Sequence, residues 1–306
     1  MAVLTGAFPL ATETNTSLDS YIPQIWGEKV NEFYRNKLVT APFFTNRSDE
    51  VSGGGDTLYT PNTTEFTANA KTTGSVVTLN SNSDTKQTLS VSNWFESSFA
   101  IEDAEAAQVK RSYSIMERYS KNVAYAIAKK VDTSICQLFQ QFTNAVGSST
   151  NNLGDSDIRA AFAYLETTGV DSMESAFFVS PNVFWKQIQA IDKFSLAVNS
   201  PVNDPTAKRP NGHLYGQPVY VTAQITTTTT PSGGLSNALA VPDAIHWAAS
   251  PLGQGGSKAN AMVGSQGIRV QSNYIPEYLS TVTTADVLYG VCLNRATGGV
   301  LIKTAS

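Results

Sequence analysis

The sequence contains few of the residues that most enzymes use for catalysis. Only two histidines, His213 and His246, and two cysteines, Cys136 and Cys292, occur in 306 residues. A Ser–His–Asp site needs a histidine beside a poised serine, and no GxSxG motif marks such a serine. Zinc-ligand spacings, EF-hand loops, P-loops and dinucleotide-binding motifs are also missing from the sequence. We therefore expect a protein that is not an enzyme, with no catalytic, cofactor-binding or metal-binding residues and no cofactor.

Charged residues are scarce as well. They make up 15% of the chain, against about 25% in typical soluble proteins, while hydrophobic residues make up 41%. The net charge is -4 and no basic run occurs, which argues against a protein whose whole surface grips nucleic acid. A surface rich in Ser, Thr, Asn and Gly costs little to desolvate, so it suits burial against other protein. A secreted or otherwise ordinary globular protein would also fit this composition.

The sequence shows no targeting or membrane segment. Its first 20 residues lack the positive region and the sustained apolar core of a secretory signal. No run approaches the ~18 apolar residues of a membrane span, so we expect folding in the cytosol and no membrane partner. Cys136 and Cys292 lie far apart and outside any CxxC pattern. We expect both to be reduced, buried small hydrophobes, and a disulfide between them is the alternative.

One long stretch, residues 75–146, has neither glycine nor proline. Acidic residues near Glu102 suit the first turn of a helix, and Gly147, which directly follows the stretch, suits its end. Apolar residues recur there every three or four positions: Met116, Tyr119, Val123, Ile127, Val131, Ile135, Leu138 and Phe142. This pattern predicts one helix from Ile101 to about Gly147, of roughly 60 Å at about 1.5 Å per residue, that leans on a sheet. A coiled coil is the alternative, but consecutive steps of four do not match its alternating steps of three and four.

The preceding residues, 51–98, are β-prone but poor in core-forming side chains. Ten threonines lie between Thr57 and Thr88, and alternation predicts two strands around a turn at Asn80–Asp84. We interpret the segment as an extended arm that gains its partners from another chain, and an ordinary exposed hairpin is the alternative. The aromatic cluster Asn93–Phe99 is either local core or an anchor at a subunit contact. The candidate inter-subunit contacts are Leu58, Tyr59, Phe66, Val77, Leu79, Leu89, Val91, Trp94 and Phe95.

The remaining chain has mixed helix and strand signals. An amphipathic pattern predicts a helix over residues 21–39, after a polar N-terminal arm that we expect to lie on a neighbouring subunit. Residues 148–225 resemble an α/β unit, with Ser180 and Pro181 at the start of a helix. The C-terminal residues predict a hairpin, with strands near 286–294 and 300–303 around the turn "RATGG".

This order of parts resembles the major capsid proteins of tailed bacteriophages, which share the Hong Kong 97 fold. The resemblance spans nearly the whole chain. It is carried by "GGDTLYTP", "NWFESSFAIEDAEAAQ", "YAIAKKVDTSI", "IRAAFAYLETTGVDSMESAFFVSPNVFWKQI", "GQPVYVT" and "DVLYGVCLNR…GGVLIKTA". It implies an α+β, Hong Kong 97-like capsid fold with a long spine helix and an extended β-hairpin loop. The implied parts are an N-terminal arm and helix (1–50), the extended loop (51–98), the spine helix of the peripheral domain (99–147), an axial domain (148–275) and C-terminal strands of the peripheral domain (276–306).

The resemblance implies a coat protein that assembles into pentamers and hexamers of an icosahedral shell around double-stranded DNA. The expected location is the virion, after assembly in the host cytoplasm. The expected partners are further copies of the chain, a separate scaffolding protein, a portal, a decoration protein in some shells, and packaged DNA without sequence specificity. Some family members cross-link a loop lysine to a neighbour, but no glutamate motif accompanies Lys71 or Lys86, so we expect no cross-link here. The alternatives are an encapsulin-like compartment shell and, in a different class, a monomeric α/β hydrolase or sugar-binding protein.

Overall fold

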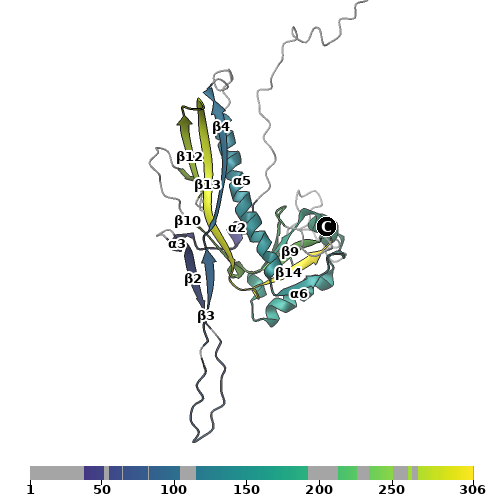
Figure 1. Ribbon diagram of the computed structural model, residues 1–306. Helices are drawn as coiled ribbons and strands as arrows, with labels where there is room; N and C mark the ends of the chain where they lie inside the picture. The colour runs from purple at the N-terminus through teal and green to yellow at the C-terminus, as the bar shows by residue number, and fades with distance from the viewer. Residues whose placement is uncertain are drawn as a thin grey trace, which may run out of the picture. The chain divides into compact units, whose positions relative to one another are not determined.

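The computed structural model describes residues 38–51, 55–63, 65–81, 83–103, 115–191, 213–225, 234–250, 261–263 and 268–305. The helix predicted over 21–39 and most of the predicted N-terminal arm therefore lie outside the described residues. The described part contains two six-stranded sheets, a separate two-stranded hairpin and several helices (Figure 1).

The first sheet is built around β13 (Ser280–Leu293), which pairs with three strands. β12 (Ile268–Ile275) pairs along 280–286, β10 (Ile245–Ser250) along 288–293, and β4 (Asn93–Glu102) along 280–289. Because a strand has only two edges, β12 and β10 share one edge of β13 in tandem, and β4 occupies the other. Short strands β11 (Ala261–Val263) and β1 (Thr45–Asn46) extend β12 and β10 respectively.

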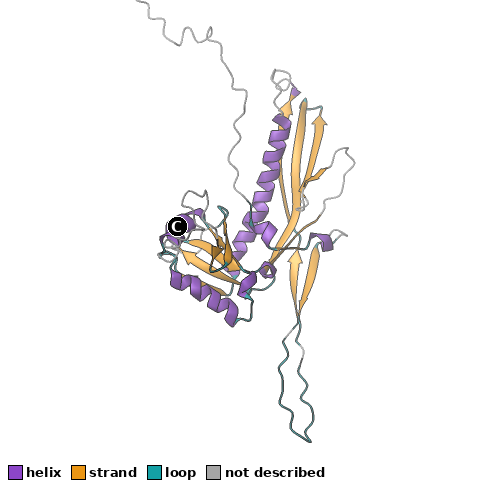
Figure 2. Ribbon diagram, turned by 180° about the vertical axis from the view of Figure 1, so that it is seen from behind, coloured by secondary structure: helices purple, strands orange, loops and turns teal. Residues whose placement is uncertain are grey.

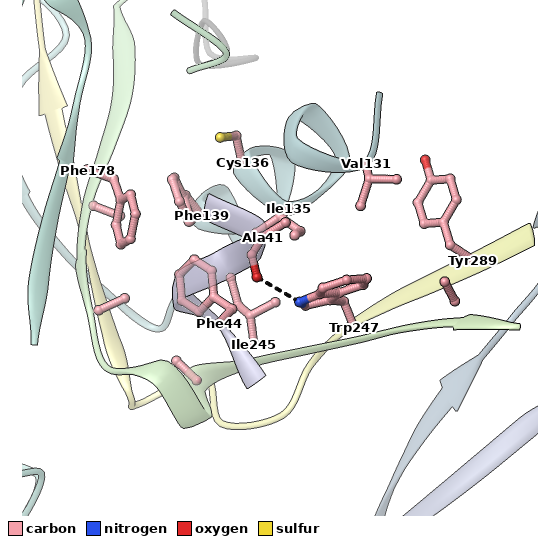
Figure 3. Close-up of a cluster of buried hydrophobic side chains, with 14 of the residues drawn as sticks. Ala41, Phe44, Val131, Ile135, Cys136, Phe139, Phe178, Ile245, Trp247 and Tyr289 are labelled. Atoms are coloured by element: carbon pink, nitrogen blue, oxygen red, sulfur yellow. Dashed lines mark hydrogen bonds between the residues drawn. The ribbon is translucent and has the colours of Figure 1, made fainter. Parts of the chain in front are cut away.

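Helix α5 (Ile115–Gln137) lies along one face of this sheet (Figure 2). Its apolar stripe, with Val131 and Ile135, is buried against the inward side chains of β10 and β13 (Figure 3). Trp247 of β10 is almost fully buried there and donates its indole N–H to the Ala41 carbonyl at 3.0 Å. Ala41 belongs to the short helix α2 (Thr40–Phe43), which is thereby fixed to the same core.

The predicted long helix is shorter than expected. Its predicted first residues, to Glu102, form the end of strand β4, and residues 104–114 lie outside the described part. After α5 come a 3₁₀ turn, η1 (Leu138–Gln141), and strand β5 (Asn144–Gly147). The prediction of a helix from Ile101 to Gly147 is therefore wrong at both ends. A lack of glycine and proline permits a strand as well as a helix, and pairing with β13 and β14 decides between them.

The second sheet has the order β5–β14–β9–β6–β8–β7. Its strands are β14 (Gly299–Thr304), β9 (Leu235–Ala240), β6 (Ala176–Val179), β8 (Gln217–Val221) and β7 (His213–Leu214). Helix α6 (Asp155–Thr167) buries Ile158, Ala161 and Leu165 against it, as the α/β pattern predicts. Short turns complete this part: η2 (Ser172–Glu174), a π-helical turn η3 (Val183–Gln187) and η4 (Ile188–Ala190).

The C-terminal strands exist, but they do not form the predicted hairpin. β13 lies in the first sheet and β14 in the second, so the chain crosses between the sheets at residues 294–298. A second crossing, through η6 (Pro242–Ala244), runs beside it. The two crossings are joined by hydrogen bonds from the Asn294 N–H to the Ala244 carbonyl (2.9 Å) and from the Val241 N–H to the Gly298 carbonyl (3.0 Å). Sheet membership also differs from the predicted division at residue 276, because β10 to β12 pair with β13.

Both cysteines are free; Cys136 is buried and Cys292 is partly buried. Burial raises the pKa of the Cys292 thiol to about 11. Burial, followed by the nearby Asp132 carboxylate, raises the pKa of Cys136 well above its ordinary range. Both shifts disfavour the thiolate form, which is the nucleophilic form of cysteine, near neutral pH.

Candidate subunit-interface surfaces

The hairpin β2 (Thr57–Asn62) and β3 (Thr85–Ser90) is anchored at its base by a small apolar cluster. Val51 of helix α3 (Ser48–Val51), Leu89, Val91 and Ala248 are all buried in it. The Val91 N–H donates to the Asp56 carbonyl at 2.7 Å, which closes the two ends of the hairpin. The base thus belongs to the folded core of this chain.

The hairpin backbone passes very close to β13 at Gly290. A Cβ added at Gly290 would lie 2.2 Å from the Ser90 carbonyl oxygen, closer than real Cβ contacts come. Glycine therefore allows the end of β3 to cross directly over β13. This crossing fixes where the hairpin leaves the sheet.

Beyond the paired strands, the tip of the hairpin (residues 65–81, called the tip below) has no strand ladder. Its turn lies at Thr72–Ser75, where the Ser75 N–H donates to the Thr72 carbonyl at 3.1 Å and Gly74 has φ +86°. The predicted turn at Asn80–Asp84 is therefore wrong. Asn80 instead joins the two arms of the tip, because its amide nitrogen donates to the Thr67 carbonyl at 2.7 Å.

The apolar side chains of the tip are not buried by this chain. Val76 is 88% exposed, Leu79 87%, Val77 66% and Phe66 61%. Burying such side chains stabilises a structure by about 1.5–3 kcal/mol each, and the isolated folded chain does not gain this hydrophobic free energy. Large apolar side chains gathered on an exposed segment mark a surface that contacts another molecule.

The structure places the nine predicted contact residues in three groups. Leu89 and Val91 are buried in the chain's own core and Leu58 packs against that core, so these three hold the hairpin base; as contacts with a neighbour they stay predictions. Tyr59 is 57% exposed, with the Lys86 Nζ 4.5 Å from its ring centroid. The rest lie on the tip or at the start of β4 and stay predictions: Phe66, Val77, Leu79, Trp94 and Phe95.

Trp94 and Phe95 lie on opposite faces of β4. Trp94 is 65% exposed and its indole N–H donates to Asp286 at 3.1 Å. Phe95 lies on the α5 side, with its ring 6.0 Å from that of Tyr289 and the Lys130 Nζ 4.8 Å from its centroid. The open face of β4 therefore carries Trp94, while Phe95 is partly occupied by this chain.

Strand β4 has a free outer edge, which the sequence did not predict. The Asp103 N–H donates to the Leu279 carbonyl at 2.9 Å, in the same register that places Glu102 opposite Ser280. Hydrogen-bonded pairs alternate along an antiparallel ladder, so odd-numbered β4 residues direct their backbone groups to β13. The even-numbered residues direct theirs outward, where no residue in the described part of the chain pairs with them. The outward residues are Trp94, Glu96, Ser98, Ala100 and Glu102.

Apart from the exposed carboxylates of Glu96 and Glu102, this edge lacks the usual protection against pairing. Isolated edge strands are commonly blunted by proline, lysine or a bulge, or are kept very short. β4 spans 10 residues with no proline and no lysine, and its ladder with β13 is unbroken over all of them. An edge of this kind is a template for a strand from another molecule.

In the described part of the chain, no cluster of metal-ligating side chains competes with these surfaces. Over the described residues, no group of three or more His, Cys, Asp or Glu side chains could hold a metal ion. His246 is buried, with its Nε2 2.8 Å from Asp243, whereas His213 is exposed on β7. Within the same residues, no helix has both the length and the apolar character required to cross a membrane.

Comparison with known proteins yields structural relatives only. No protein-family model and no curated protein matches the sequence. A solved chain from Mycobacterium phage Che8 is 18% identical, with a TM-score of 0.73 over 92% of this chain and 97% of that one. A chain from the capsid structure of the cyanophage P-SCSP1u is 12% identical, with a TM-score of 0.71 over 95% of this chain and 94% of that one.

A third relative is a chain from the asymmetric unit of the bacteriophage PhiM1 mature capsid. It is 14% identical, with a TM-score of 0.67 over 92% of both chains. The protein has a phage capsid fold. The α+β capsid fold implied by the sequence resemblance is thereby confirmed. The free edge and the exposed hairpin tip therefore belong to a chain with a capsid fold.

Proposed function

We propose that the chain is the major coat protein of a tailed phage. In this proposal it assembles as pentamers and hexamers into an icosahedral shell that encloses double-stranded DNA, and its location is the virion. Its role is structural rather than enzymatic, in line with the capsid chains that it resembles. The likeness in fold to phage capsid chains favours this function, and neither the comparisons nor the described residues favour an encapsulin-like compartment over it.

The observation that carries the proposal is a pair of incomplete β elements. The tip is extended, rich in β-branched residues and exposed, and the ladder between its two arms stops at Asn62 and Thr85. Strand β4 pairs with β13 on one side, and its outer edge has no partner among the described residues. The edge of β4 supplies backbone N–H and C=O groups for a β-ladder, and the tip supplies apolar side chains that cover a face of the sheet.

Charge also favours contact between the tip and β4 of different copies. Glu96 and Glu102 on the outward side of β4 are exposed carboxylates. Lys71 on the tip and Lys86 on β3 are exposed lysines. Opposite charges on two surfaces steer their encounter and fix their register more than they add affinity.

The two sheets suggest a revised division into domains within this proposal. The peripheral domain would comprise α5 with the first sheet, including β10 to β12. The axial domain would comprise α6 with the second sheet, including β14. A scaffolding protein, a portal and a decoration protein remain proposed partners, since nothing in the described residues identifies them.

The proposal is tested by expressing the full chain and examining it by size-exclusion chromatography and negative-stain microscopy. We expect shells, tubes or capsomer rings, and a variant in which residues 66–80 are replaced by a short Gly-Ser turn should stay folded but remain unassembled. The matched control keeps the length of the tip and changes only Thr63→Ser, outside the apolar segment. A chain that stays monomeric under all conditions, even with co-expressed phage scaffolding proteins, would refute the proposal. Mass spectrometry of particle contents separates the alternatives, since a genome indicates a virus and a single cargo enzyme indicates a compartment.

A further inference from the structure

Helix α2 is a single turn that contacts side chains of both sheets. The Ala41 carbonyl accepts the indole N–H of Trp247 from the first sheet. Phe44, directly after the helix, stacks on Phe178 of the second sheet with ring centroids 5.3 Å apart (Figure 3). A helix this short is not stable by itself in water, so these contacts hold it in place. We call residues 39–44 the strap.

The first turn of the strap is capped by a residue far away in the sequence. Val39, at the N-cap position, makes no side-chain hydrogen bond to the helix. Instead, Asp132 of α5 accepts at Oδ1 from the N–H groups of Thr40 (3.0 Å) and Ala41 (3.1 Å), and from the Thr40 hydroxyl. One carboxylate oxygen therefore satisfies three donors, and the start of the strap depends on a single side chain.

The hydrogen bonding of Asp132 is only half complete. Asp132 and Thr40 are both 0% exposed, and Oδ2 of Asp132 accepts no hydrogen bond from any described residue. A buried polar oxygen without a partner is unfavourable, and water would supply partners once the strap opened. The closed strap therefore contains an unfavourable interaction that opening would relieve.

Two larger contributions oppose each other at the strap. Burial of Val39 and Phe44 favours the closed state. The conformational entropy of six residues favours the open state, and for so short a segment it is similar in size. Opening should therefore require less free energy than unfolding the two sheets. It should also stop at Thr45, because Thr45 and Asn46 form β1, which pairs with β10.

Cys136 lies one helical turn after Asp132 and reports on the strap. Its side chain is 0% exposed, and the thiol is hydrogen-bonded to Thr40. A thiol reagent can therefore react with Cys136 only after the packing around Thr40 is lost. This gives the opening of the strap a chemical signal that does not depend on assembly.

We propose that the strap is a conformational latch that opens as a unit while both sheets stay folded, and that subunits open it during shell assembly. Opening frees six residues, which at about 3.3 Å each lengthen the connection between residues 1–38 and β1 by up to about 20 Å. The use in assembly rests on the proposed shell function, in which one sequence meets different neighbours in pentamers and in hexamers. The opening itself does not rest on that function.

Opening is tested by labelling Cys136 in the unassembled full chain with dithiobis(nitrobenzoate), after Cys292→Ala has removed the second thiol. Without urea, we expect labelling at least tenfold faster than global unfolding allows, with a weaker urea dependence. Thr40→Val loses the hydroxyl contacts with Asp132 and Cys136 and should be labelled about fivefold faster. Thr167→Val is the matched control, since it loses a hydroxyl contact on α6 and should leave the rate unchanged.

The use in assembly is tested with Thr40→Cys in the same Cys292→Ala chain. Oxidised glutathione should join this thiol to Cys136 and hold the strap closed, and dithiothreitol should release it. We expect the oxidised chain to need at least tenfold more subunit to assemble than the same chain after reduction, as measured by light scattering and microscopy. Thr40→Val needs no disulfide, and its more easily opened strap should assemble at or below the parent concentration.

Two results would overturn the inference. One is labelling of Cys136 at the rate and urea dependence of global unfolding, in the parent and in Thr40→Val alike. The other is assembly of the oxidised and reduced Thr40→Cys chains at the same concentration. A parent chain that never assembles refutes the shell function but leaves the labelling result intact, so the failures of the two proposals are distinguishable.

Discussion

A proline scan of β4 tests the free edge most directly. Ser97 and Ser98 are neighbours with the same side chain, but their backbone N–H groups point in opposite directions. Ser97 pairs with Ala285 of β13, whereas Ser98 belongs to the outward set. Proline removes the N–H donor, and strands tolerate it only where that N–H faces away from the ladder.

The expected magnitudes differ for the two positions. Ser97→Pro removes a ladder hydrogen bond and leaves a carbonyl of β13 unpaired, which should cost the subunit about 2–4 kcal/mol of unfolding free energy. Ser98→Pro should cost the subunit less than about 1 kcal/mol, because only an exposed hydroxyl contact with Glu96 is lost. At a contact with another copy, however, Ser98 is the middle of five outward residues. Breaking a strand added there should weaken each contact by about 1–3 kcal/mol, or about 5- to 150-fold.

Urea unfolding of the unassembled subunit measures the first effect, and light scattering with microscopy measures the second. Ser98→Thr is the control, since it keeps the N–H group and strand propensity and should behave like the parent. We expect Ser97→Pro to be unstable, and Ser98→Pro to be stable but defective in assembly. Assembly of Ser98→Pro at the parent concentration would refute the role of the edge. Equal destabilisation by both prolines would refute the assignment of outward residues.

Two further predictions concern the core and its titration. Asp132→Ala should lower the unfolding free energy by about 2–5 kcal/mol and speed amide exchange at Thr40 and Ala41, because their N–H groups donate to Asp132 Oδ1 at 3.0 and 3.1 Å. Asp132→Asn should lower the unfolding free energy by less than half as much, since it keeps the Oδ1 acceptor and replaces Oδ2, for which the described residues provide no partner. Equal losses for the two variants would contradict the assigned hydrogen bonds. The folded pKa of Cys292, about 11, lies above its ordinary value of 9.0, so this thiol's contribution to stability is complete below pH 9 and is lost as pH rises towards 11. Urea unfolding between pH 8 and 11 should show a smaller loss for Cys292→Ala than for the parent, because Cys136, whose pKa is also raised, still contributes in the variant. Identical profiles would contradict burial of the Cys292 thiol.

Local patterns in the sequence were sufficient for several elements. The apolar stripe of α5 from Val123 to Ile135 is buried as its spacing predicts, because a helix that packs against a sheet buries one face and exposes the other. The threonine-rich segment is a hairpin with an exposed tip, since it has too few large apolar residues to form a core of its own.

Other features depended on partners distant in the sequence. Residues 101 and 102 were predicted to begin the long helix, and only their pairing with Thr281 and Ser280 of β13 makes them the end of a strand. In the sequence, Leu89 and Val91 have the same alternating apolar pattern as Val77 and Leu79, which are exposed. The crossing of β3 over Gly290 buries Leu89 and Val91. No local signal marks these positions.

By itself, the sequence determined the helical centre of α5, the helix α6 and the β-prone hairpin that is too poor in apolar residues to stand alone. These properties depend on neighbours a few residues away. The tertiary structure alone decided that β13 and β14 belong to different sheets and that the even-numbered groups of β4 face outward. Those outcomes follow from register and strand order, which depend on the pairing of residues far apart along the chain.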